Sequence, residues 1–427
     1  MFKGKKIKVL IAMLSVLLML TACGAPAVSE PAAPANTEPA NEAPVVEAPE
    51  EGAAPSGDPL RLGVIAPITG ASAFSGEMMS IASTLAVEQM NAAGGIQGHP
   101  VELLIENDNY EAATCVAAAE KLTSQDNVHF VCGPIASSTA AAVQIITDEA
   151  KVPHIIPSGS AAALTREGTD WFFRLTLADV YQTAVLADLV ANQMGFSNVA
   201  ILAESASHGE GTIASWERDL EPFGIVPTVE RFEDSDIDFS AQVTKVKGTN
   251  PDCVIVAAAS VGTGATILKQ AREVGIDAQF IISSAVAGSN DFCNLAGEAA
   301  EGAIGTSSFL SNNPDPVVQK FVEDFTAASG KEPEGKEAAQ LYDAFMILNE
   351  YLNQKNDDGT YKYPLEFTAA ALESDRAMIR EALTNVKAYH GATGLDVNFG
   401  PEITPEDRDG LKQPLLITVK GGQWEAL

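Results

Sequence analysis

From Leu60 onward, short apolar segments alternate with segments in which apolar residues recur at helical spacing. LRLGVIAPI, which starts at Leu60, has the composition of a buried strand, and Met78, Ile81 and Leu85 follow it at the spacing of one helix face. The alternation continues through VELLIEND, VHFVCG, NVAILAE, CVIVAAA and QFIIS. This pattern predicts parallel sheets covered by helices on both faces, and there are more strands than one sheet holds comfortably at this length. We therefore predict an α/β protein with two doubly wound lobes.

Two consecutive predicted strands run into loops rich in small hydroxyl residues. GPIASST follows the strand that ends near Cys132, and PSGS follows the next strand at Pro157. In doubly wound sheets ligands bind outside the carboxyl ends of the strands, so we expect both loops at one crevice. A helix predicted from Ala136 to Ile146 would present unpaired N–H groups there, which favours binding of a carboxylate. The alternative is that the hydroxyl residues at 137–139 only cap this helix.

The N-terminal segment has the pattern of an export signal followed by a tether. A lysine-rich start precedes an apolar run from Val9 to Ala22 that is too short to span a bilayer comfortably. The run ends in LTACG, which resembles a bacterial lipobox in which Cys23 becomes the diacylated first residue. An ordinary secretory signal with a chance cysteine is the alternative. We predict a lipoprotein signal peptide at 1–22, a lipidated cysteine with a disordered Pro/Ala/Glu tether at 23–58, and a location outside the cytoplasmic membrane of a bacterium.

Charge, hydropathy and motifs exclude several functional classes. The net charge of −31 argues against a nucleic-acid partner, and a mean hydropathy of +0.08 argues against an integral membrane protein. GxSxG, HExxH and CxxC are absent, and the histidines are scattered, so we predict no enzyme, metal or cofactor. GKEPEGKE imitates a P-loop through Lys336, but it ends in Glu and no strand precedes it, so we assign it no phosphate site.

Four cysteines follow Cys23, an even number that is compatible with disulfides in an exported protein. Cys115 falls on a predicted helix and Cys132 at the end of the next strand, and elements of this kind pack together. This pair is the preferred bridge, and Cys253 with Cys293 is the weaker candidate. Four buried free thiols are the alternative.

The ordered set of segments resembles a known family. The matching segments are RLGVIAPITGASAFSG, NAAGGIQGHPVELLIENDNYEAATCVAAAEKL, VCGPIASSTAAAV, FFRLTLADVYQ, SHGEG, PDCVIVAAASVGTGATILKQAREVGI, AAQLYDAFMILNEYL and YHGATGLDVNFG. In this order they resemble the leucine/isoleucine/valine-binding protein family, the substrate-binding proteins of ABC importers. The resemblance extends from about Leu60 to Leu427.

The resemblance implies the type I periplasmic binding protein fold, in which two Rossmann-like lobes are joined by three crossovers and close on the ligand by a hinge. The crossovers are expected near Leu177, Ser308 and His390. The predicted lobes are 59–177 with 309–390, and 178–308 with 391–427.

The resemblance also implies ligand-binding residues. Ser137 matches a serine that holds the ligand carboxylate, and Ser158 and Ser160 match a loop that holds the carboxylate and the ammonium group. Asp179 matches an acid that often faces the ammonium group, and a helix N-cap is its alternative role. Ser75, in the first matching segment, is a further candidate.

Three candidate positions depart from the family pattern. His208 replaces a usual tyrosine, Ser260 replaces an aromatic wall residue, and Ser284 stands where amino-acid binders often carry Glu. A buried ammonium group needs a carboxylate partner, which Asp179 can supply. Without it, a plain carboxylate or a neutral amide would fit, and the smaller wall residues permit a bulkier ligand.

The resemblance implies an extracytoplasmic binding protein that delivers a small carboxylate-bearing solute to ABC permease subunits. A branched-chain or other apolar amino acid is the first expectation for the ligand. The alternatives are an aromatic acid, a short amide or another organic acid, a ligand-sensing ectodomain, and a periplasmic hydrolase. We expect a monomer held at the membrane by its lipid anchor.

Overall fold

The fold is described from a computed structural model, in which residues 54–427 except 71, 168 and 234 are described. The predicted signal peptide, Cys23 and most of the tether lie outside these residues. The described residues belong to one compact unit. Within the described ranges, no helix combines the length and the apolar character needed to cross a membrane.

The first sheet has six strands, and every neighbouring pair is parallel. Its order is β13 (Asp409–Leu411), β5 (Phe172–Leu177), β4 (His154–Ile156), β3 (Phe130–Cys132), β1 (Leu60–Ala66), β2 (Val101–Asn107). From β1 the chain winds outward in both directions, so the loops after β1 and β3 flank the point at which the winding reverses. Ligand crevices form at such points in doubly wound sheets.

The second sheet repeats this plan and adds two antiparallel strands at one edge. Its order is β15 (Gln423–Ala426), β14 (Leu415–Lys420), β10 (Ile304–Ser307), β9 (Gln279–Ile282), β8 (Cys253–Ala257), β6 (Val199–Glu204), β7 (Thr228–Phe232). Its winding reverses between β6 and β8. A separate two-stranded sheet pairs β11 (Tyr389–His390) with β12 (Asp396–Val397). The prediction of two doubly wound α/β lobes is confirmed.

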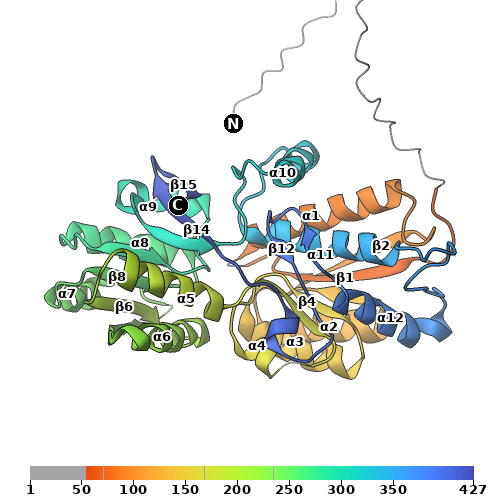
Figure 1. Cartoon of the computed structure of the whole chain (residues 1–427), viewed down its shortest axis with the longest axis horizontal. Coiled ribbons are helices and arrows are strands. Elements are labelled where there is room, and N and C mark those ends of the chain that lie inside the picture. Colours follow the sequence, from red (N-terminus) through yellow and green to blue (C-terminus); the bar gives the residue numbers. More distant parts are fainter. Residues whose placement is uncertain (1–53, 71, 168, 234) are drawn as a thin grey trace, which may run out of the picture. The chain divides into compact units, whose positions relative to one another are not determined.

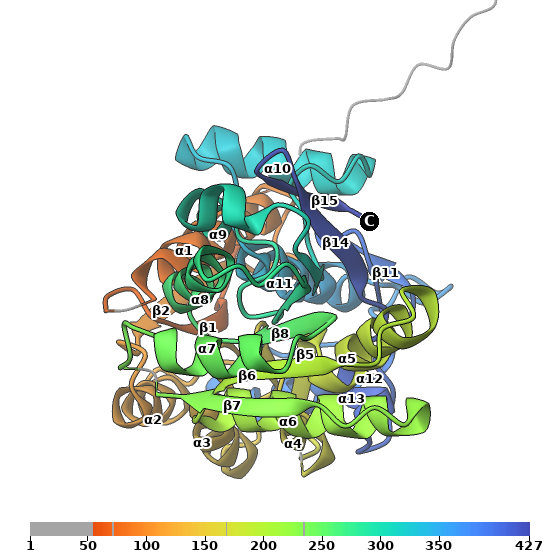
Figure 2. The ribbon, with the colours of Figure 1, turned by 90° about the vertical axis from the view of Figure 1, so that its left-hand side faces the viewer.

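Helices cover both faces of each large sheet (Figures 1 and 2). Those packed with the first sheet are α1 (Ala73–Ala92), α2 (Ala112–Glu120), α3 (Ser137–Glu149), α4 (Ala163–Arg166), α10 (Pro316–Ser329), α11 (Lys336–Leu352), α12 (Leu372–Thr384) and α13 (Pro405–Arg408). Those packed with the second are α5 (Asp179–Asp188), α6 (Ser207–Leu220), α7 (Ser240–Gly248), α8 (Val261–Glu273) and α9 (Asn290–Ala296). Short π-helical and 3-10 turns follow several of them, at Lys121–Gln125, Leu189–Gln193, Glu221–Phe223 and Gly297–Ala300, and Ala369–Ala371 precedes α12.

The chain passes between the two sheets at three places. It leaves the first sheet after Leu177, returns after Ser307, and leaves it again after Leu411. The predicted third crossing near His390 is therefore wrong. Asp409 and Leu411 of β13 pair with β5 of the first sheet, so residues 391–411 belong to the first lobe and not to the second.

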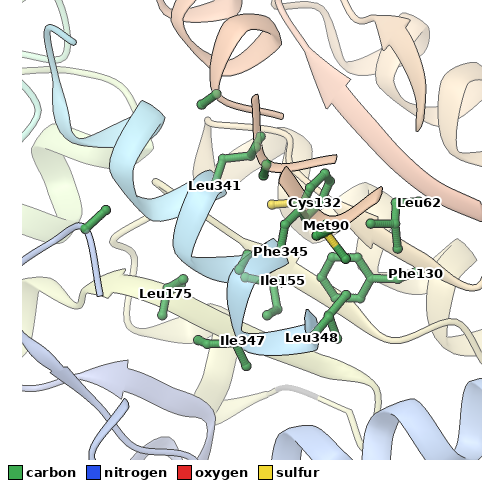
Figure 3. Close-up of a cluster of buried hydrophobic side chains, with 14 of the residues drawn as sticks. Leu62, Met90, Phe130, Cys132, Ile155, Leu175, Leu341, Phe345, Ile347 and Leu348 are labelled. Atoms are coloured by element: carbon green, nitrogen blue, oxygen red, sulfur yellow. The ribbon is translucent and has the colours of Figure 1, made fainter. Parts of the chain in front are cut away.

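The largest core lies between the first sheet and the helices α1 and α11 (Figure 3). In Figure 3, Phe345 and Leu348 of α11 point at Phe130 and Cys132 of β3. The two helices bury an apolar stripe against one face of the sheet, and other helices cover the opposite face. Because side chains on both faces of the strands are buried, the strand sequences are almost continuously apolar.

The predicted bridge between Cys115 and Cys132 is wrong, because both thiols are free and buried. Adjacent residues of a strand point to opposite faces, and β3 places Cys132 in the core beside α11. Cys115 lies in the cluster on the other face, together with Val131. A disulfide cannot join side chains across the thickness of a sheet. Cys253 and Cys293 are also free and lie in different clusters, and burial raises the pKa of Cys293 to about 11.

Candidate ligand-binding site

The loops after β3 and β4 meet, as their predicted positions at one sheet edge require. Ser137 is the first residue of α3, and its hydroxyl accepts a hydrogen bond from the backbone N–H of Ala161 at 3.2 Å. The N-cap residue of α3 is Ala136, which has no side chain that can cap the helix. Side-chain capping therefore does not explain the hydroxyl residues, and the first turn of α3 keeps its N–H groups at the loop that contains Ser160.

Ser158 and Ser160 face two different sets of partners. The Ser158 hydroxyl donates a hydrogen bond to Glu337 Oε1 at 2.9 Å. Ser160 is buried, and its backbone carbonyl accepts a hydrogen bond from the backbone N–H of Asp179 at 3.0 Å. Ser160 thus lies directly beside the first residue of α5, at the first crossing between the sheets.

A buried ion pair lies beneath the Ser158–Ser160 loop. The Arg174 guanidinium group contacts Asp409 Oδ1 through Nε at 2.8 Å and Nη2 at 2.7 Å, and both side chains are buried. The same group donates to the backbone carbonyl of Ala161 at 2.8 Å and to the Thr165 hydroxyl at 2.7 Å. Arg174 therefore holds the loop in place from below, and the sequence analysis assigned no role to either member of the pair.

The second sheet contributes a small pocket that contains three of the predicted residues. Asp179, His208 and Ser284 line it, and the space in it that admits the centre of a water-sized sphere is about 20 Å³. The rest of its lining is half polar and half apolar and comes from α5, α6, the strands β8, β9 and β10, and the residue that follows β9. The Ser284 hydroxyl accepts a hydrogen bond from Gln182 Nε2 at 3.1 Å, and Gln182 Oε1 in turn accepts one from Thr306 at 2.7 Å. The pocket has room for a water molecule and not for an amino acid side chain.

Ser75 and Ser260 are not brought together with these residues. Ser75 lies half-buried in α1, and Ser260 is exposed. The Ser260 hydroxyl is the N-cap of α8, where it accepts a hydrogen bond from the backbone N–H of Thr263 at 3.1 Å. Neither residue lines the pocket that Asp179 shares with His208 and Ser284.

Lys336, the lysine of the rejected P-loop pattern, lies between Ser284 and the Ser158–Ser160 loop. It bonds to Ser284, and its neighbour Glu337 bonds to Ser158. Lys336 is the first residue of α11, and its ammonium group donates to the backbone carbonyl of Ser284 at 2.7 Å. Burial lowers the pKa of Lys336, while the negative charges of Glu337 and Asp179 act in the opposite direction. A lysine in the first turn of a helix is unfavourable because its charge opposes the helix dipole. This unusual position is the sequence signal that could have marked Lys336 as a site residue.

Within the described part of the chain, no group of three or more His, Cys, Asp or Glu side chains could hold a metal ion. The site thus consists of backbone N–H groups, hydroxyl groups, two carboxylates and one ammonium group. These are groups that bind a small polar molecule through hydrogen bonds and charge.

Comparison with known proteins identifies the family of this chain. Residues 59–417 match the family model described as periplasmic binding protein. The leucine-, isoleucine-, valine-, threonine- and alanine-binding protein of Pseudomonas aeruginosa is 29% identical over 292 residues, which cover 68% of this chain and 77% of that protein. The Leu/Ile/Val-binding protein of Escherichia coli is 28% identical over 300 residues, which cover 70% of this chain and 80% of that protein.

Solved structures give the same result. The leucine-binding protein LivK of Thermotoga maritima matches with a TM-score of 0.73 at 25% identity, over 86% of this chain and 97% of that one. The branched-chain amino acid transporter substrate-binding protein LivJ of Streptococcus pneumoniae, solved with isoleucine, also has a TM-score of 0.73 at 25% identity, over 86% of this chain and 98% of that one. The fold is that of the type I periplasmic binding proteins, and the chain belongs to the periplasmic binding protein family, whose members are substrate-binding proteins.

Proposed function

We propose that this protein captures a small carboxylate-bearing solute for an ABC importer, with a branched-chain or other apolar amino acid as the ligand. The relatives from Pseudomonas aeruginosa and Escherichia coli are named for such amino acids, and the Streptococcus pneumoniae structure contains isoleucine. The structural match to the Streptococcus pneumoniae protein covers 86% of this chain and 98% of that one.

The observation that carries the proposal is the meeting of the Ser137 and Ser160 loops at the start of α3. Unpaired N–H groups and the positive end of the helix dipole stabilise a carboxylate without any nearby arginine. Here they lie next to the Ser137 hydroxyl group, which can donate to the same carboxylate. The first lobe then binds the acidic end of the ligand.

The second lobe supplies Asp179, His208 and Ser284 at a shared pocket beside Ser160. In the proposed mechanism these groups close over the ligand by a hinge motion. Specificity follows from hydrogen bonds that only the right head group satisfies. The closed form is then recognised by permease subunits, and Cys23 carries the lipid that keeps the protein at the membrane.

Replacing Ser160 with Ala is expected to weaken binding of leucine by about 1–3 kcal/mol, because a buried hydrogen bond to the ligand is lost. Isothermal titration calorimetry on the wild type and the variant measures this difference. Ser138→Ala is the matched control, since Ser138 is exposed in the same part of the site, and we expect its affinity to equal that of the wild type. An unchanged affinity in Ser160→Ala would remove Ser160 from the binding site.

A further inference from the structure

Lys336 contributes a positive charge at a place where the fold makes that charge costly. It opens α11, whose first-turn N–H groups already carry partial positive charge, and its N-cap Gly335 offers no side chain. The ammonium group is also partly removed from water, which lowers the pKa of Lys336. A buried ammonium group is tolerated only where acceptors and negative charges surround it.

One hydrogen-bond acceptor and two negative charges compensate this charge, and they come from both lobes. The carbonyl oxygen of Ser284, which follows β9, accepts a hydrogen bond from Lys336 Nζ at 2.7 Å. Glu337 on the neighbouring position and Asp179 at the start of α5 provide the two negative charges that act on Lys336. Glu337 is itself fixed, because the Ser158 hydroxyl donates to its Oε1 at 2.9 Å.

The ammonium group of an amino acid bound in this site would need the same acceptors. With its carboxylate at Ser137 and Ser160, its amino group would have Asp179 as the adjacent acid, because the Asp179 N–H bonds to the Ser160 carbonyl at 3.0 Å. A second positive charge beside Lys336 would meet repulsion in a medium of low dielectric constant. The ligand ammonium group and the Lys336 ammonium group would therefore share the negative charge of Asp179.

We propose that Lys336 is a specificity-determining residue whose ammonium group lies beside the ammonium subsite of this protein. The chain thus carries its own cation next to the place where an amino acid would bring one. This narrows the preference of the site for α-amino acids over carboxylic acids of the same shape that lack the amino group. The inference rests on the proposed function, since it assumes that the ligand carboxylate binds at Ser137 and Ser160.

The test compares leucine with 4-methylpentanoate, which is leucine without its amino group. Dissociation constants for both compounds are measured by isothermal titration calorimetry on the full chain, on Lys336→Met and on Lys336→Gln, with the melting temperature of each variant as a check of folding. Removing the charge of Lys336 is expected to shift the ratio of the two constants at least tenfold in favour of leucine. The polar Gln variant provides the measurement if the Met variant does not fold.

Lys331→Met is the matched control, because it removes the same charge five residues away. Lys331 is exposed and pairs with Glu77 of α1 at 2.6 Å, so the ratio should stay within twofold of the wild type. A ratio that shifts less than tenfold in the Lys336 variants, or shifts against leucine, overturns the inference and leaves the proposed function standing. If neither compound binds to any of the proteins, the proposed function is wrong and the inference fails with it.

Discussion

Replacing Arg174 with Met is expected to lower the free energy of unfolding by about 3–5 kcal/mol, because it leaves Asp409 as an uncompensated charge in the interior. Arg174 and Asp409 are 1% and 0% exposed, so solvent cannot take over the role of the lost partner. The carbonyl of Ala161 and the hydroxyl of Thr165 also lose their donor. Urea denaturation followed by circular dichroism measures the change.

Two variants test this explanation. In Arg174→Met combined with Asp409→Leu, most of the lost stability should return, because an apolar pair of similar volume replaces the buried charges. Arg231→Met removes one partner of the exposed Arg231–Glu210 ion pair and should leave the free energy of unfolding nearly unchanged, because solvent and salt screen this pair. If Arg174→Met were as mild as Arg231→Met, the buried pair would not support the Ser158–Ser160 loop in the way described.

Replacing Gly133 with Ala is expected to cost about 2–5 kcal/mol and to weaken ligand binding as well. Gly133 has a φ of +100°, which L-residues adopt at a cost of about 1–2 kcal/mol. A Cβ atom there would also lie 2.1 Å from the backbone carbonyl oxygen of Ile65 in β1, and such overpacking typically costs about 1–3 kcal/mol. The backbone must shift, and the shift displaces the loop that leads to Ser137.

The control for this prediction is Gly195→Ala. Gly195 also has a positive φ, at +72°, but a Cβ atom there would have no neighbour within 4 Å. It should lose only the conformational contribution of about 1–2 kcal/mol, with unchanged leucine affinity. Denaturation and calorimetry on both variants separate the two effects. If the two variants lost equal amounts of stability and of leucine affinity, the close approach of residue 133 to Ile65 would not explain why glycine is needed there.

The alternation of apolar segments predicted the sheets correctly because it reports burial on both faces of parallel strands. The third crossing was misplaced for a physical reason. Short strands such as β13, at Asp409–Leu411, carry too few residues for a recognisable pattern, and only their pairing with β5 assigns them to a lobe. The disulfide prediction failed because adjacency of a helix and a strand does not reveal the face to which a side chain points, and Cys132 and Cys115 pack in clusters on opposite faces of the sheet.

The sequence predicts the residues of the candidate site that directly follow strands. It does not predict the residues whose place in the site depends on contacts with distant parts of the chain. Ser137 and Ser160 follow consecutive strands, so topology alone places their loops at one edge. Arg174 and Asp409 are 235 positions apart, and nothing local marks them as partners. Lys336 lies on a helix that begins far along the chain, and its hydrogen bond to Ser284 depends on the packing of both lobes.

In the proposed function, the first lobe binds a carboxylate through the N–H groups of α3 and the serine loops. Calorimetric titration of the full chain with two matched pairs of compounds tests this binding mode: leucine with leucinamide, and 4-methylpentanoate with 4-methylpentanamide. The amides keep the shape of the acids and lack their negative charge. At least one acid should bind saturably, and each amide should bind at least 100-fold more weakly than its acid. An amide that binds as tightly as its acid would contradict the claim, as would the absence of binding by both acids.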